Sequence, residues 1–177
     1  MHLIPSSNGI QFLLLTNSLK SFSFAGMIQF ERILFPTDFS DSAENASQYV
    51  ISLAKKYGSK IHVLHVVEPF TYTSDFGIDY SAQYKEMETT AKRLIGEIIA
   101  SLKKSSLDAE GAVLSGEPFV EIIRYARQEN ADLIVMATHG RKGIEHMLLG
   151  SVAERVVRKS PFPVLTVKKA GQTFTMP

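Results

Sequence analysis

From residue 28 onward, short runs of β-forming apolar residues alternate with longer segments whose apolar residues recur every three or four positions. The short runs are typical of buried strands, and the longer segments are typical of amphipathic helices. Strand patterns occupy residues 32–36, 61–67, 112–114, 132–137 and 163–167, and helix patterns occupy 43–57, 87–102, 118–126 and 149–156. A helix between successive strands favours parallel pairing. The sequence therefore predicts an α/β fold, an open, doubly wound sheet of five parallel strands with helices on both faces.

The 177 residues suit one domain with an appendage. Residues 1–26 carry a single Lys or Arg, Lys20, and show neither a helix nor a strand period. We expect a poorly ordered extension at 1–26, one domain at 27–170 and a short tail at 171–177. An upstream start codon ahead of Met27 is the alternative origin of the extension.

Charge and composition exclude several classes of function. Lys and Arg number 19 against 18 Asp and Glu, so no basic field would attract nucleic acid or anionic lipid. The chain has no Cys, which excludes disulfides, thiolate metal sites and a Cys nucleophile. No apolar run approaches the roughly 20 residues that span a bilayer. We expect a cytoplasmic protein without nucleic-acid or membrane partners.

Parallel α/β sheets bind ligands at the carboxyl ends of their strands. Thr37 and Asp38 follow the first strand, and a glycine-rich loop follows the fourth. Gly150-Ser151 stands before a helix pattern, where free backbone N–H groups and the helix dipole attract anions. Gly140 would let phosphate oxygens approach the main chain. The alternative is that these glycines only cap the helix and shape turns.

Catalytic and metal-binding patterns are lacking. His62 and His65 are three apart on a strand and therefore face opposite sides, so they do not share a metal ion. The chain has neither an H-E-x-x-H pattern nor a G-x4-G-K-[S/T] loop. We expect no catalytic residues, no metal ligands and no enzyme activity.

Several sequence blocks in order make the chain recognisable. They are residues 33–40, Gly116-Glu117-Pro118, Met136 to Gly140, Gly150 to Arg155 and Ser160 to Leu165. Over residues 28–169 the chain resembles the universal stress protein family, whose fold is Rossmann-like and similar to the adenine nucleotide alpha hydrolases. The ATP-binding branch of that family carries G-x2-G-x9-G-[S/T], and here Ala137 replaces the first Gly. With negative φ this Ala costs little, whereas positive φ would strain the site by about 1 kcal/mol or more.

The resemblance implies a role for each residue of the motif. Asp38 resembles the adenine-recognising Asp, with a helix N-terminal charge as its alternative, and Val66 resembles the residue whose main chain meets the base. The implied ATP-binding residues, with Mg²⁺ bridging the phosphates, are Pro36, Thr37, Asp38, Val66, Ala137, Gly140, Arg141, Gly150, Ser151 and Val152. Of these, Ala137, Gly140 and Arg141 would border the ribose and phosphates, and Gly150, Ser151 and Val152 would hold the phosphate tail by their N–H groups.

The implied function is that of an ATP-binding stress-response protein, a sensor or regulator with slow or no hydrolysis. A dimeric scaffold of the same fold without nucleotide is the alternative, and an ATP-hydrolysing enzyme of the wider adenine-binding group is a remote one. The family pairs two edge strands, so we expect a homodimer through Pro163 to Val167.

Overall fold

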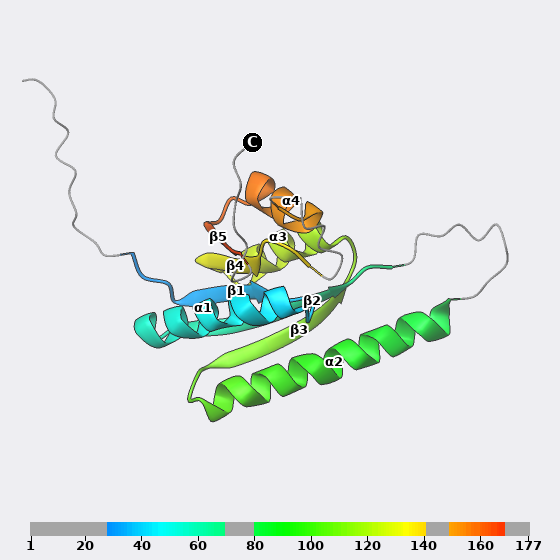
Figure 1. Cartoon of the computed structure of the whole chain (residues 1–177), viewed down its shortest axis with the longest axis horizontal. Coiled ribbons are helices and arrows are strands. Elements are labelled where there is room, and N and C mark those ends of the chain that lie inside the picture. The colour runs from blue at the N-terminus through cyan, green and yellow to red at the C-terminus, as the bar shows by residue number, and fades with distance from the viewer. Residues whose placement is uncertain (1–27, 70–79, 141–148, 169–177) are drawn as a thin grey trace, which may run out of the picture.

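The computed structural model describes residues 28–69, 80–140 and 149–168. In chain order its elements are β1 (Arg32–Pro36), α1 (Asp41–Tyr57), β2 (Lys60–Val67), α2 (Ser81–Lys104), β3 (Ala109–Ser115), α3 (Pro118–Gln128), β4 (Leu133–Ala137), α4 (Ser151–Lys159) and β5 (Val164–Val167) (Figure 1). The predicted alternation of strands and helices is confirmed. The expected extension at 1–26 and tail at 171–177 lie outside the described residues.

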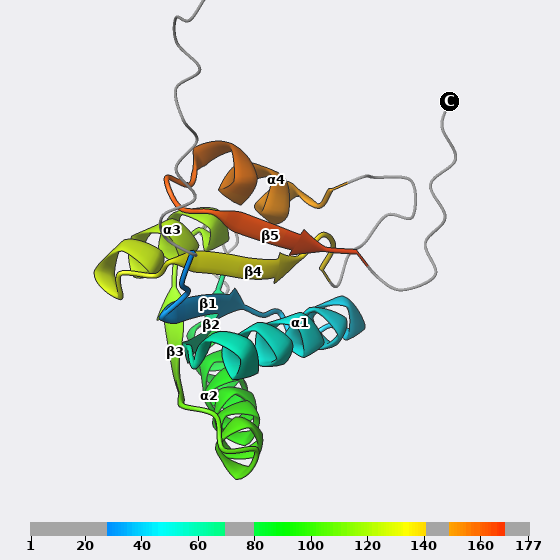
Figure 2. The ribbon, with the colours of Figure 1, turned by 90° about the vertical axis from the view of Figure 1, so that its left-hand side faces the viewer.

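All strand pairs are parallel, and the order across the sheet is β3-β2-β1-β4-β5. Figure 2 shows β5, β4 and β1 lying side by side. The chain first runs outward from β1 to β3 and then returns to the other side of β1 with β4. The order therefore reverses between β1 and β4, where ligands bind in folds of this kind. The last strand lies at a sheet edge, as predicted.

The helices cover both faces of the sheet. Ile33 and Phe35 of β1 pack with α1 and α2, whereas Leu34 between them packs with α3 and α4. All three side chains are buried, because the central strand is covered on both sides. This burial fixes the register of β1 and thus the position of the residues that follow it.

Local capping sets the bounds of α1. The Ser40 hydroxyl accepts a hydrogen bond from the Ala43 N–H, which caps the start of the helix. At its end, Gly58 has φ 71° and donates its N–H to the Ala54 carbonyl. The turn after β1 is therefore bounded by a fixed strand and a capped helix.

Strand β3 is longer than the sequence pattern indicates. It carries Gly111, and a Cβ there would lie 2.5 Å from Cγ2 of Ile95 on α2. The helix packs so closely on this edge strand that a side chain is excluded, which hides the strand pattern. Helix α2 begins at Ser81, six residues before Met87, which is the first residue of its predicted pattern.

No helix among the described residues is long and apolar enough to cross a membrane.

Candidate functional site

A cavity of about 470 Å³ opens at the carboxyl ends of β1 and β4. It lies where the strand order reverses. Nine of the ten sequence-predicted site residues line it, namely Pro36, Thr37, Asp38, Val66, Ala137, Gly140, Gly150, Ser151 and Val152. Arg141 lies outside the described residues. The fold thus brings together segments that are about 100 residues apart in the chain.

The turn after β1 fixes the Asp38 carboxylate. The Thr37 N–H donates to the Leu64 carbonyl at 2.9 Å, which ties the turn to β2. Oδ1 of Asp38 accepts from the Ser40 N–H at 3.1 Å and from the Ser40 hydroxyl at 2.6 Å. Ser40 caps α1, so Asp38 is not the capping residue and is part of the cavity wall.

Phe39 adopts a backbone conformation that is rare for a bulky side chain, with φ 63°. Its ring packs against His65 with centroids 4.4 Å apart. Nδ1 of His65 lies 2.7 Å from the Thr37 carbonyl oxygen. Packing and hydrogen bonding therefore hold a strained turn in place, as is common beside binding sites.

Gly140 lies directly beside the Asp38 carboxylate. Its φ lies outside the positive range, so it is not required for a left-handed conformation. A Cβ at this position would lie 2.6 Å from Oδ2 of Asp38. The glycine lets the carboxylate approach the loop after β4, and this contact joins the two strand ends that form the cavity.

Ala137 is accommodated without strain. It is the last residue of β4, and the described non-glycine residues with positive φ are Phe39, Ser106 and Asn130. An Ala side chain is therefore compatible with the backbone where the family motif has Gly. This resolves the question of strain raised by the altered motif.

The start of α4 presents unpaired N–H groups to the cavity. Gly150 donates its N–H to the Thr138 carbonyl at 2.7 Å, so the expectation that this N–H holds phosphate is wrong in this conformation. The N–H groups of Ser151, Val152 and Ala153 form the first turn and have no intrahelical acceptor. Among the described residues, no acceptor is recorded for them. Such N–H groups and the positive end of the helix dipole favour negatively charged groups in general.

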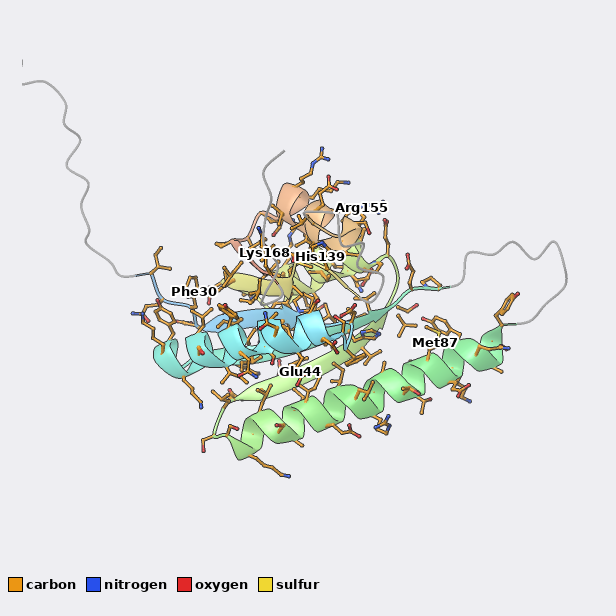
Figure 3. All side chains as sticks on the ribbon, in the orientation of Figure 1. Phe30, Glu44, Met87, His139, Arg155 and Lys168 are labelled. Carbon is orange, nitrogen blue, oxygen red and sulfur yellow. The ribbon has the colours of Figure 1, made fainter. Side chains whose placement is uncertain are left out.

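Sequence reasoning missed the apolar wall and two polar residues after β4. The wall consists of Leu64, Pro118, Ile122 and Met136, which read as ordinary core positions in sequence. Thr138 and His139 also line the cavity, and the Thr138 hydroxyl lies 2.9 Å from Nδ1 of His139. Figure 3 shows His139 near the middle of the molecule, directly after β4. Their position directly after a buried strand is the sequence feature that could have predicted them as cavity residues.

An ion pair borders the cavity. Arg155 on α4 donates to Glu117 at 2.5 Å, and its guanidinium also lies over the Phe119 ring (labelled Arg155 in Figure 3). Glu117 precedes Pro118, a wall residue. The pair links the start of α3 to α4 and so stabilises the spacing between two sides of the cavity.

The sheet topology and the cavity define the class: a doubly wound α/β protein with a cavity at its topological switch point. The comparison with known proteins gives the family. Residues 29–168 match the model of the universal stress protein family. The chain belongs to this family, as its sequence blocks predicted.

Individual relatives agree with this assignment. Universal stress protein MJ0531 of Methanocaldococcus jannaschii is 33% identical over 144 residues, which are 79% of this chain and 83% of that protein. The solved structure of MJ0577 from the same organism is 30% identical, with a TM-score of 0.69 over 81% of this chain and 99% of that one. The Archaeoglobus fulgidus universal stress protein in complex with dAMP is 24% identical, with a TM-score of 0.57, covering 79% of this chain and 98% of that one.

Proposed function

We propose that this protein binds ATP in the cavity between β1 and β4 and acts as a stress-response sensor or regulator. One observation carries the proposal: a fixed carboxylate, Asp38, and the unpaired N–H groups at the start of α4 face the same cavity. A carboxylate accepts hydrogen bonds but donates none. It therefore favours the exocyclic amine of adenine over the carbonyl oxygen of guanine.

The remaining walls suit the other parts of a nucleotide. The apolar side chains of Leu64, Ile122 and Met136 provide a surface for a base, and Val66 offers its main chain at the end of β2. The N–H groups of Ser151, Val152 and Ala153 would hold phosphate oxygens. When bound, Mg²⁺ would neutralise and bridge the phosphates. A relative from Archaeoglobus fulgidus in complex with dAMP supports an adenine nucleotide as the ligand.

We infer slow or no hydrolysis of the bound nucleotide. The sequence lacks the G-x4-G-K-[S/T] loop that places a lysine and a magnesium ligand beside the transferred phosphate. In this proposal the Asp38 carboxylate binds the base and has no role at the phosphates. The proposed role is therefore nucleotide binding rather than nucleotide hydrolysis. We also propose that the protein is located in the cytoplasm.

Calorimetric titration with ATP and with GTP tests the proposal. We expect ATP–Mg²⁺ to bind at least about tenfold more tightly than GTP–Mg²⁺, the difference made by about one hydrogen bond to a charged group. Gly150→Asp sets a negative charge beside the phosphates and abolishes binding. Gly96→Asp adds the same charge on α2, where a Cβ meets no atom within 4 Å, and leaves binding intact. Equal affinity for both nucleotides, or retained affinity in Gly150→Asp, contradicts the proposal.

The exposed edge of the sheet favours a homodimer, which we also propose. Strand β5 lies at the edge, with Leu165 38% exposed, and Val157 on the neighbouring α4 is 46% exposed. Two such edges joined across a twofold axis would cover these apolar side chains. The alternative function is that of a dimeric scaffold that binds no nucleotide. The ATP titration distinguishes this scaffold from a nucleotide-binding protein.

A further inference from the structure

A second group of polar side chains lies at the opposite end of the sheet from the cavity. His62 is in the first half of β2, and Glu110 is its register partner on β3. Glu129 follows the last residue of α3. One nitrogen of His62 and one oxygen of each carboxylate all lie within 4.8 Å of one another. Three different elements therefore bring an imidazole and two carboxylates to one point.

The imidazole is buried, and its nitrogens lack hydrogen-bond partners. The His62 side chain is only 3% exposed. Its Nδ1 lies 3.0 Å from Oε1 of Glu110 and 3.9 Å from Oε2 of Glu129. Among the described residues, neither ring nitrogen makes a hydrogen bond. Nδ1 is close to Glu110, but the two groups are not aligned for a hydrogen bond. A buried polar group of this kind costs free energy unless something else binds it.

The carboxylates can contact an ion without giving up their other interactions. Oε2 of Glu110 pairs with Lys60 at 2.6 Å, whereas Oε1 faces His62. The Lys60 contact thus orients Glu110 as an outer partner orients a metal ligand. The side chains of Glu110 and Glu129 are 44% and 28% exposed, so the point between them is open to solvent on that side.

We propose that His62, Glu110 and Glu129 form a binding site for a divalent transition-metal ion of the zinc class. Zinc accepts both imidazole nitrogen and carboxylate oxygen as ligands, and three protein ligands leave the fourth tetrahedral position open for water. Zinc bonds to nitrogen and oxygen are about 2.0–2.2 Å long. Donor atoms separated by 3.0 and 3.9 Å are thus close enough to share one ion, after a small rotation of the exposed carboxylates.

The test is titration of the full chain with zinc chloride in the absence of nucleotide. Calorimetry is expected to give one ion per chain. Long-range ¹H–¹⁵N spectra of the histidine rings should show that Nδ1 of His62 is the nitrogen that shifts. Glu110→Gln and Glu129→Gln each weaken binding by more than about tenfold, since loss of even an outer partner has such an effect. Both are partly exposed, so the variants are expected to fold, which circular dichroism checks.

Two controls separate this site from other zinc binders. Glu97→Gln removes an α2 carboxylate that pairs with Arg93 and leaves zinc affinity unchanged. His146→Asn removes a histidine of the glycine-rich loop and also leaves it unchanged. Absence of zinc binding, a shift at another histidine, or full affinity in both Glu110→Gln and Glu129→Gln overturns the proposal. ATP binding is read out separately and does not depend on this result.

Discussion

The Asp38 carboxylate is held from two sides, by Ser40 in its own turn and by Gly140 in the loop after β4. Ser40 donates two hydrogen bonds to Oδ1, and the bare backbone of Gly140 leaves space for Oδ2. A carboxylate so restrained loses little freedom when it accepts a hydrogen bond from a base. Its position therefore depends on Gly140 as much as on its own turn.

Gly140→Ala tests that dependence. A Cβ at this position would lie 2.6 Å from Oδ2, so the carboxylate must move away from the loop after β4. We expect calorimetry to show ATP affinity reduced by about tenfold or more, the effect of one misplaced hydrogen bond to a charged group. Selectivity over GTP should fall with it. Unchanged affinity and selectivity would show that Asp38 does not need this position.

At the scale of single residues, sequence patterns identified which residues line the cavity but not which contacts each of them makes. Nine predicted residues line it, because strand ends and a glycine motif are local signals. The pattern did not show that Gly140 makes room for Asp38, since that contact joins residues 102 positions apart. Nor did it show that the Gly150 N–H is taken by Thr138. The pattern also did not show the cluster around His62, because its three residues come from distant parts of the chain: β2, β3 and the end of α3.

Two glycines, one after the last residue of α1 and one within α2, allow a stability test at the scale of elements. Gly58 ends α1 with φ 71°, whereas Gly96 lies within α2 without positive φ, and a Cβ meets no atom within 4 Å at either position. Gly58→Ala should destabilise the protein by about 1 kcal/mol. Gly96→Ala should stabilise it by up to about 1 kcal/mol. Chemical denaturation measures both, and equal effects would contradict the backbone assignment of the α1 cap.

Elements with strong local signals were predictable, and those shaped by tertiary contacts were less so. Helix α1 has a Ser cap, an apolar stripe and a final Gly, and its bounds matched closely. Strand β3 was predicted three residues long but spans Ala109–Ser115, because α2 requires a glycine within it. The first turns of α2 are largely exposed, so no apolar stripe marked where the helix begins.

At the scale of the whole molecule, the two ends of the parallel strands carry different groups of side chains. The carboxyl ends of β1 and β4 carry the cavity, and the His62 cluster lies near the opposite end of β2. The alternation of strands and helices was sufficient to predict the layers. The order β3-β2-β1-β4-β5 places the last strand at an edge, where an apolar side chain stays exposed.

The edge strand makes the oligomeric state testable. Light scattering should give a mass of about twice 19.7 kDa for the intact protein. Leu165→Glu puts a charge into the proposed interface on β5 and should yield the monomer. Val120→Glu, at a 41% exposed position on α3, should leave the dimer intact. A wild-type mass of 19.7 kDa would rule out the proposed assembly.

In the proposed complex, the N–H groups at the start of α4 hold the phosphates of an adenine nucleotide. Amide NMR during titration with ATP–Mg²⁺, and separately with adenosine, tests this contact. We expect the amide signals of Ser151, Val152 and Ala153 to shift strongly with ATP and little with adenosine, while Val66 responds to both. Amide signals of these three residues that stay in place at saturating ATP would contradict the claim.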